Sequence, residues 1–304
     1  MTTPAEVDAL EALRGADLAL LGFRPDDAAA LRALVDDLGN RPALLARVAT
    51  VREAARARIG DFDAGSAAVA SAANPRVEED GIVALLGLTA VAADVHAELT
   101  GRGVPSEIAW TSLADLGQQA YIHRVVHGRF GLSSQTWCAA NYTGRLLWLG
   151  RLQFTLERDG LGATAGRDTH VLGVHIPEAG PLTPEAIDES LRLAREIAFP
   201  AFADHGPRTF VLHSWLLDPG IVSDLHPDSN MARFARRFEP IGSPSPGDRD
   251  ALFFGFHVEP GEEPVDLDAL PQDTSLQRSI VRRLKSGGVS VCSGVLREGD
   301  EGGR

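Results

Sequence analysis

The sequence predicts an α+β protein in two parts, a helical N-terminal domain over residues 1–140 and a mixed α/β domain with a central sheet over residues 141–297. Three observations support this prediction. The chain of 304 residues is long enough for two ordinary domains. Apolar residues recur every three or four positions in the first part, as on helices, and at alternate positions after about residue 140, as on strands. The polar end, EGDEGGR (298–304), predicts a disordered tail.

The first part is expected to be a bundle of helices. A stripe of apolar side chains indicates that the first of them faces a core; its members are Ala28, Leu31, Leu34, Val35 and Leu38. Further helices are expected from Pro42 to Gly60, from Ile82 to about Leu99 and from Ser106 to Gly128. The helix after Ile82 is apolar nearly all round, which places it in the middle of the bundle. The small, polar segment 61–74 between helices predicts a loop.

The second part begins with a long two-residue alternation. It predicts one strand over 145–157 with one buried face, with a bulge at Gly150. Four further strands are expected, over 171–176, 209–217, 252–258 and 289–296. Helices separate them. Thr183 and Pro184 form an N-cap followed by proline, and Thr274 and Gln277 fit a capping box. Segment 226–242 is expected to be helical, with Phe234 and Phe238 on one face.

The composition excludes several classes of protein. A net charge of −13 and a pI near 5.1 argue against a nucleic-acid partner. Two cysteines without CxxC spacing favour neither a disulfide framework nor a cysteine-ligated metal site. The N-terminus lacks the pattern of a signal peptide, and the apolar stretch 82–93 is too short to span a bilayer. We therefore expect a cytoplasmic protein that binds no membrane; its oligomeric state is open, with a homodimer as one alternative.

Polar residues concentrate in two predicted strands and the turns that follow them. His175 and His213 each lie among aliphatic residues, and Glu178 and Asp218 follow beside prolines. A histidine in such a strand is either a proton shuttle or a core residue with one hydrogen bond. We expect His213 and Trp215 to share a face. His213 should line the cleft between the two strands, within reach of Glu178 or of a bound acyl group. A serine hydrolase is not supported because there is no G-x-S-x-G motif.

Two more segments are candidates for ligand binding. The turn at 178–183 contains Gly180 and ends at a helix N-terminus, so it is either an anion site or an ordinary capped loop. Asn230 and Arg233, near the start of the next predicted helix, either contact a phosphorylated ligand or belong to a solvated face. His123 and His127 have a spacing that suits a metal, but without a third ligand we expect polar surface residues there.

The order of strands and helices in the second part resembles the core of the GNAT N-acyltransferase superfamily. More specifically, the chain resembles bacterial two-domain proteins with an N-acyltransferase N-terminal helical domain and a GNAT-like C-terminal domain. The segments that carry the resemblance are GRLQF (150–154), LGVHIPEAGPLTPEAIDESL (172–191), HSWLLDP (213–219), DSNMARF (228–234) and LPQDTSLQR (270–278). The resemblance implies an acyltransferase that takes acyl-CoA as co-substrate and acts on an amine or hydroxyl of a small-molecule acceptor, with no metal.

The resemblance also implies residue roles. Glu178 or His175 would be the general base, and His213 would face the cleft. The residues implied in CoA binding are Val174, Ile176, Gly180, Leu182, Thr183, Asn230 and Arg233. GNAT enzymes usually carry Q/R-x-x-G-x-G/A at the pyrophosphate turn, whereas this chain has EAGPLTPE, with one glycine and no leading Arg or Gln. Two alternatives stay open: a catalytically inactive ligand-binding or protein-interaction module, and a metal enzyme using His175, Glu178, His213 and Asp218.

Overall fold

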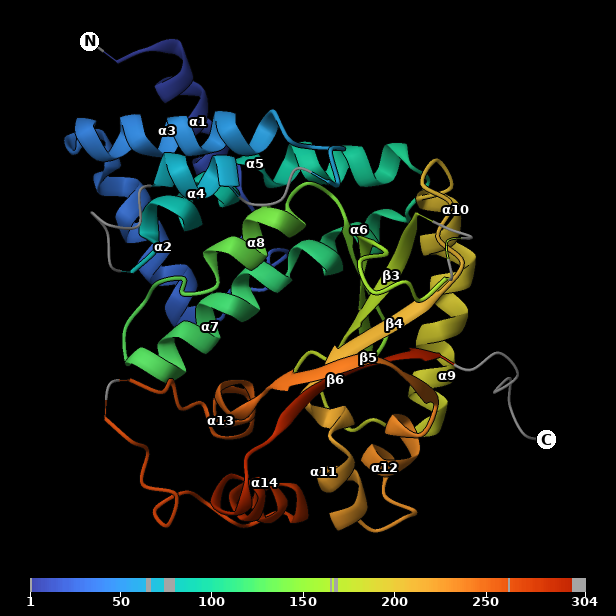
Figure 1. Ribbon diagram of the computed structural model, residues 1–304. Coiled ribbons are helices and arrows are strands. Elements are labelled where there is room, and N and C mark those ends of the chain that lie inside the picture. The colour runs from blue at the N-terminus through green and yellow to red at the C-terminus, as the bar shows by residue number, and fades with distance from the viewer. Residues whose placement is uncertain are drawn as a thin grey trace. The chain divides into compact units, whose positions relative to one another are not determined.

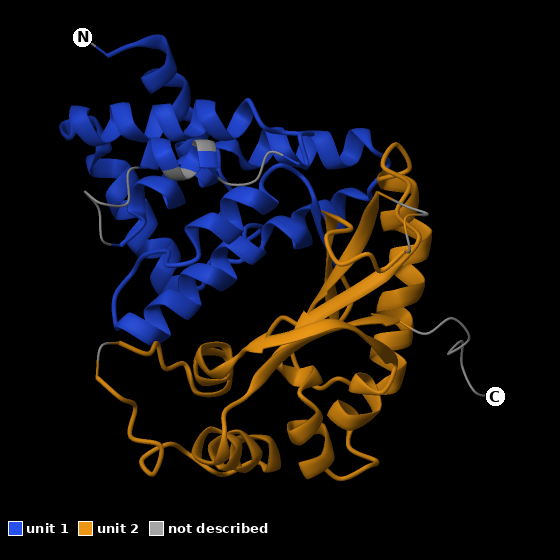
Figure 2. Ribbon diagram, viewed as in Figure 1, with its two compact units in different colours: residues 1–148 blue, residues 149–304 orange. Residues whose placement is uncertain are grey.

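The computed structural model describes residues 2–63, 67–73, 80–164, 166, 169–261 and 263–296. The chain divides into two compact units, residues 1–148 and 149–304 (Figure 2). Each unit is described by itself below, with its helices and strands labelled as in Figure 1. The expected disordered tail at 298–304 lies outside the described residues.

The first unit is helical, as predicted (Figure 1). Its helices are α1 (Pro4–Gly15), α2 (Pro25–Asp37), α3 (Pro42–Arg56), α4 (Ala67–Ala73), α5 (Ile82–Gly101), α6 (Ser106–Leu113), α7 (Asp115–His127) and α8 (Gln135–Asn141), with a short 3-10 turn, η1 (Leu38–Asn40). Helices α1, α2 and α3 each begin with proline, whose fixed φ and missing N–H suit the first helical position.

Helix α5 forms the core of this unit. Most of its side chains are buried, and Gly87 allows α3 to approach closely, since a Cβ there would lie 2.3 Å from Cγ1 of Val51. By length and composition, α5 is the one helix among the described residues that could cross a membrane. However, 67% of its most apolar 18-residue window is buried inside the protein. Our expectation that the stretch was too short is wrong, because the helix continues past Ala93 to Gly101. This burial is typical of a central core helix.

Two other expectations for the first unit are wrong. Helix α4 occupies residues 67–73 of the predicted loop; residues 64–66 and 74 lie outside the described part. The helix expected over 106–128 is interrupted at Ala114. The N–H of Gly117 donates to the carbonyl of Leu21, 3.0 Å away and outside the helix, and this diverts the backbone ladder.

The chain forms a mixed six-stranded sheet in the order β1-β2-β3-β4-β6-β5. Strands β2 to β6 belong to the second unit, and the boundary between the units falls within β1. The strands are β1 (Leu146–Leu149), β2 (Leu152–Arg158), β3 (His170–His175), β4 (Phe210–Ser214), β5 (Phe238–Pro246) and β6 (Ser290–Leu296). The pairs β2–β3, β4–β6 and β5–β6 are antiparallel, and β3–β4 is parallel. A helical part followed by a mixed sheet confirms the predicted fold class.

Helices and short helical turns connect these strands. They are α9 (Pro184–Leu193), the π turn η2 (Ala194–Ala198), α10 (Phe199–Ala201), the 3-10 turn η3 (Trp215–Leu217), α11 (Pro219–Asp224), α12 (Asn230–Ala235), α13 (Asp248–Phe256) and α14 (Ser275–Ser286). Thr183 caps α9 and the capping box of Thr274 and Gln277 begins α14, as predicted.

Four local expectations for the second unit are wrong. The strand expected over 145–157 is a pair, β1 and β2, joined by the two-residue turn Gly150–Arg151, where Gly150 has φ of +66°. The strand expected over 209–217 ends at Ser214, so Trp215 begins a 3-10 turn and does not continue the face of His213.

In the other two wrong expectations, a helix was expected where the structure has a strand, or a strand where it has a helix. The strand expected over 252–258 is helix α13, whose buried residues Ala251 and Leu252 pack into the second unit while Phe254 is exposed. The helix expected over 226–242 contains only α12, and Phe238 starts strand β5. β5 is the last strand of the sheet, and an edge strand tolerates the prolines that it carries.

Candidate active site

The two central parallel strands separate at their carboxyl ends. Their register runs from Leu172↔Phe210 to Val174↔Leu212 and stops there. Beyond this point β3 stays paired with β2, through Gln153↔His175. β4 stays paired with β6, through His213↔Ser293 and Ser214↔Cys292. A gap in the backbone pairing therefore opens where β3 and β4 each carry a histidine.

His175 belongs to a short polar chain across β2 and β3. Its Nε2 lies 2.8 Å from Oγ1 of Thr155 and 3.4 Å from Oε1 of Glu157. The hydroxyl of Thr155 in turn donates to Oε1 of Glu157 over 2.5 Å. Thr155 is fully buried, whereas 32% of the His175 side chain is exposed. The histidine is thus held on one side and accessible on another.

These contacts assign the tautomer of the imidazole. The single hydroxyl proton of Thr155 is used in its bond to Glu157, so the Thr155 oxygen must accept from His175. Nε2 of neutral His175 therefore carries the proton, and Nδ1 carries the lone pair. A carboxylate behind one ring nitrogen orients the imidazole and stabilises its protonated form, which is what a general base requires.

Gly173 makes room for this arrangement. It lies between Val171 and His175 on the same face of β3, opposite Thr155. A Cβ at this position would lie 2.5 Å from Oε1 of Glu157. The carboxylate can reach over β3 toward His175 only because residue 173 has no side chain.

His213 lies on the same face of the sheet as His175. The register places it next to His175 on the neighbouring strand, at the first position where the two strands no longer pair. Its Nδ1 lies 2.7 Å from the hydroxyl of Ser293 on β6, and its side chain is exposed. The expected contact between His213 and Glu178 is wrong, because the hydrogen-bond partner of His213 is Ser293 on β6.

Glu178 pairs instead with His257, a residue that we did not predict. Its Oε2 lies 3.2 Å from Nε2 of His257, and the Glu178 side chain is 64% exposed. His257 ends helix α13 with φ of +55°, a left-handed conformation that is uncommon for histidine. The sequence carried no signal for this contact, because segment 252–258 was interpreted as a strand.

The turn between β3 and α9 contains three of the residues implied in CoA binding. Gly180 has φ of +99°, Leu182 is buried, and Thr183 accepts a hydrogen bond from the N–H of Ala186. The turn is fastened from outside by Arg151, whose Nε donates to Gly180 O over 2.9 Å and whose Nη1 donates to Pro177 O over 2.8 Å. Arg151 was not predicted as a site residue, although it lies within the segment GRLQF.

The other residues implied in CoA binding are more scattered. Val174 is still paired with Leu212, so of the two strand positions only Ile176 lies beyond the last pair. Asn230 begins α12 after the N-cap Ser229. Arg233 is half exposed and pairs with Asp228 at 3.2 Å, which fits a solvated face.

The residues of the metal-enzyme alternative do not come together. Asp218 is buried and accepts from the N–H groups of Gly220, Ile221 and Ser290. Within the part of the chain that the structure describes, no group of three His, Cys, Asp or Glu side chains is placed to hold a metal ion.

Burial raises the pKa of both cysteine thiols, that of Cys138 strongly and that of Cys292 with a further contribution from Asp218.

The histidines of α7 correct another expectation. His123 is buried, with 3% of its surface exposed, rather than lying on a polar surface. Its Nδ1 lies 2.7 Å from the hydroxyl of Ser133, and Nε2 of His127 lies 2.9 Å from the same oxygen. The two histidines therefore anchor the segment that follows α7.

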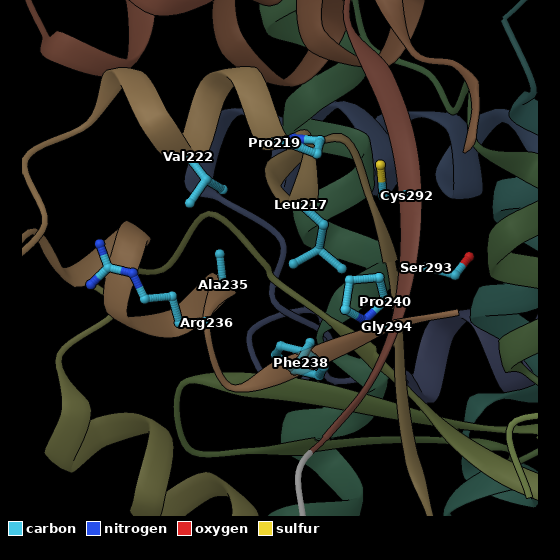
Figure 3. A pocket seen from close by; sticks show the side chains of 10 residues that line it. All are labelled: Leu217, Pro219, Val222, Ala235, Arg236, Phe238, Pro240, Cys292, Ser293 and Gly294. Carbon is cyan, nitrogen blue, oxygen red and sulfur yellow. The ribbon is translucent and has the colours of Figure 1, made fainter. Parts of the chain in front are cut away.

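An apolar pocket of about 210 Å³ lies elsewhere in the second unit (Figure 3). Its walls come from η3, α11, α12, β5 and β6, and the residues that line it are Leu217, Pro219, Val222, Ala235, Arg236, Phe238, Pro240, Cys292, Ser293 and Gly294. Leu212 pairs with Gly294 and Gly294 with Pro240, so these strand positions share the face opposite His213. The pocket is thus on the other face of the sheet from the two histidines.

Comparison with known proteins agrees with this architecture. Residues 16–144 match the N-acyltransferase N-terminal domain, and residues 146–296 match the GNAT-like C-terminal domain. A crystal structure of an acyltransferase mutant in complex with octanoyl-CoA is 32% identical, with a TM-score of 0.78, over 92% of this chain and 86% of that one. An acyltransferase in complex with decanoyl-CoA and teicoplanin is 31% identical, with a TM-score of 0.76, over 92% and 85%. A search of curated proteins gave no match.

The separated parallel strands, the capped turn and the helical first unit define an acyltransferase of the GNAT class that uses acyl-CoA as co-substrate. The chain belongs to the family in which an N-acyltransferase N-terminal domain precedes a GNAT-like C-terminal domain. The predictions of family, fold class and enzyme class are thereby confirmed.

Proposed function

We propose that this enzyme transfers a medium-length acyl group from CoA to an amino group of a glycopeptide acceptor. Two observations on relatives support this choice. Acyltransferases about 31% identical to this chain have been crystallised with decanoyl-CoA and teicoplanin and with CoA and 10C-teicoplanin. The relative that is 32% identical carries octanoyl-CoA.

His175 is the general base of this proposal, and the Glu157–Thr155–His175 chain is the observation that carries it. Nδ1 of His175 takes the proton as the acceptor nitrogen attacks the thioester carbonyl. A C–N bond forms, the C–S bond breaks, and the electron pair leaves with the CoA sulfur. Glu157, 3.4 Å from the ring, stabilises the imidazolium that results.

His213 and Ser293 are assigned a second role beside the reacting carbonyl. They lie on the same face as His175, one strand away. A donor at this position would stabilise negative charge on the carbonyl oxygen or return a proton to the departing thiolate. The CoA arm would then pass the gap between β3 and β4 near Ile176, and its diphosphate would lie against the turn that contains Gly180 and Thr183.

The assignment of the base is tested by His175→Asn, with acyl transfer measured in steady state and octanoyl-CoA as donor. We expect kcat to fall by at least ~100-fold, while CoA affinity and the unfolding temperature stay close to wild type. His170→Asn is the matched control, because His170 lies on the same strand but points to its opposite face. Equal activity of wild type and His175→Asn would remove His175 from the mechanism.

The same measurements separate catalysis from the alternative of an inactive ligand-binding or protein-interaction module. Such a module would bind acyl-CoA without turnover in the presence of any amine acceptor. The polar chain at His175 favours catalysis, because a binding module has no need of an oriented base at the strand gap.

The setting of the reaction follows from composition. We propose that the enzyme works in the cytoplasm. Its two cysteines are free, which suits a reducing compartment, and the CoA thioester donor is present there. Its net charge of −13 favours a cationic or neutral acceptor over a nucleic acid. We expect no membrane partner. Sedimentation would distinguish a monomer from a homodimer.

A further inference from the structure

The side chain of Arg151 bonds to backbone carbonyl oxygens rather than to a carboxylate. Arg151 forms the turn between β1 and β2 together with Gly150, and the hydroxyl of Ser190 on α9 accepts its backbone N–H over 2.8 Å. Its side chain reaches the next turn of the fold, where Nε and Nη1 bond to the carbonyl oxygens of Gly180 and Pro177. The guanidinium is thereby fixed against the turn that precedes α9.

The charge of Arg151 is not balanced by a carboxylate. The hydrogen bonds of its side chain all go to carbonyl oxygens, and among the described residues it forms no ion pair. This is unexpected in a chain with 42 acidic and 29 basic residues. Partial burial without a counter-ion lowers the pKa of the Arg151 guanidinium from its ordinary value. A half-buried cation in this situation is stabilised by any anion that binds beside it.

The rest of the turn, PEAGPLTPEA (177–186), contains no cationic side chain. Pro184 has no N–H, and the N–H of Ala186 is already bonded to the hydroxyl of Thr183. Glu178 adds a negative charge, which His257 holds at 3.2 Å. The arginine or glutamine that usually leads this turn in GNAT enzymes is absent. A cation from another part of the chain is needed if the turn is to receive a diphosphate.

We propose that Arg151 binds the diphosphate of the CoA donor and supplies the positive charge that the turn itself lacks. The inference rests on the proposed function, which places the diphosphate at this turn. Two nitrogens of the guanidinium orient it on the carbonyl oxygens, and Nη2 remains to donate to a phosphate oxygen. A planar guanidinium suits this double task, because its donors lie in a rigid fork.

The test compares donors that have and lack the diphosphate, in full-length protein. Binding of CoA is measured by calorimetry, and kcat/KM is measured with octanoyl-CoA and with octanoyl-pantetheine. For Arg151→Met we expect CoA affinity and kcat/KM for octanoyl-CoA to fall by ~10- to 100-fold, as for the loss of a charged hydrogen bond. The kcat/KM for octanoyl-pantetheine should change less than about twofold, because that donor has no diphosphate.

Two further variants sharpen the comparison. Arg151→Lys keeps the charge and loses the fork, so a smaller loss, again confined to CoA donors, is expected. If Arg151→Met fails to fold, Arg151→Lys still tests the contact with the diphosphate. Arg192→Met is the matched control; it removes the same charge from α9, where Arg192 pairs with Glu189 and Glu196 on an exposed face. It should leave both donors unaffected.

Glu178→Gln provides a change of the opposite sign. Removal of a negative charge beside the diphosphate should tighten CoA binding by a few fold at low salt, and the gain should shrink as salt is added. The same variant would lose most of its turnover if Glu178 were the general base, so it separates the two roles.

Three outcomes would overturn the inference. Equal affinity of wild type and Arg151→Met for CoA would exclude a diphosphate contact. Equal losses with octanoyl-CoA and octanoyl-pantetheine would reduce Arg151 to a residue that shapes the turn. A gain in CoA affinity in Arg151→Met would contradict the charge argument. Failure of the wild type itself to bind CoA would instead refute the proposed function, so the two failures are distinguishable.

Discussion

His175 and His213 occupy neighbouring positions of one sheet face, yet their surroundings give them different chemistry. His175 is backed by a buried threonine and a carboxylate, which assign its proton to Nε2. Among the residues that the structure describes, His213 has the hydroxyl of Ser293 as its hydrogen-bond partner. The ring of His175 is therefore oriented by two neighbours and that of His213 by one, which is why the proposed mechanism uses His175 as the base.

Gly173→Ala tests the carboxylate at the residue scale. The new methyl group would overlap Oε1 of Glu157, which sits at the flexible end of its side chain and can move away at small cost to folding. We expect the unfolding temperature to change little and kcat to fall by ~10-fold or more, as for the loss of a group that orients a catalytic residue.

The control for this prediction is Gly160→Ala, at a position where an added Cβ meets no atom within 4 Å. A normal kcat for Gly173→Ala, with a normal pH profile, would show that the Glu157–Thr155–His175 chain does not support the base. A large drop in stability would point to backbone strain instead.

At the element scale, the turn between β1 and β2 connects the sheet to the proposed donor site. Gly150 adopts φ of +66°, and a Cβ there would lie 3.0 Å from the hydroxyl of Ser190. That hydroxyl holds the N–H groups of Arg151 and Leu152. The hydroxyl of Ser190 therefore joins the turn and the start of β2 to helix α9.

Gly150→Ala should destabilise the fold by ~1 kcal/mol, because an L-residue is strained at this φ and the methyl group crowds Ser190. The free energy of unfolding in urea measures this loss. CoA affinity should fall as well if Arg151 is displaced from the turn before α9. Gly162→Ala, also at positive φ but in open space, reports the backbone strain alone. Identical results for the two variants would show that the contact with Ser190 contributes nothing.

At the scale of the whole molecule, the chain consists of two compact units, and the residues assigned to CoA binding all belong to the second. A ligand that binds only the folded state stabilises it by mass action, by about 2.7 kcal/mol at a hundredfold excess over its dissociation constant. CoA should therefore raise the unfolding temperature. Hydrogen exchange should slow near Arg151 and across 177–187, and stay unchanged in α1 to α3. Protection confined to the first unit would contradict the location of the donor site.

The sequence by itself determined the features that depend on local pattern. The helical first part, the strands at 171–176 and 289–296, and the caps at Thr183 and Thr274 follow from periodicity and turn chemistry, which act over a few residues. The acyltransferase class came from a resemblance carried by several separate segments, and the matches to both domain families confirm it.

Only the tertiary structure decided which distant groups meet. His213 pairs with Ser293, 80 residues away, and Glu178 with His257, 79 residues away, in a segment that was expected to be a strand. That segment is helix α13, which packs against α14, and an edge position allowed the prolines of β5. Arg151 acquires its importance from the carbonyl oxygens of a turn 26 to 29 residues later. Such contacts depend on the register and packing of the whole sheet, which no local window of sequence contains.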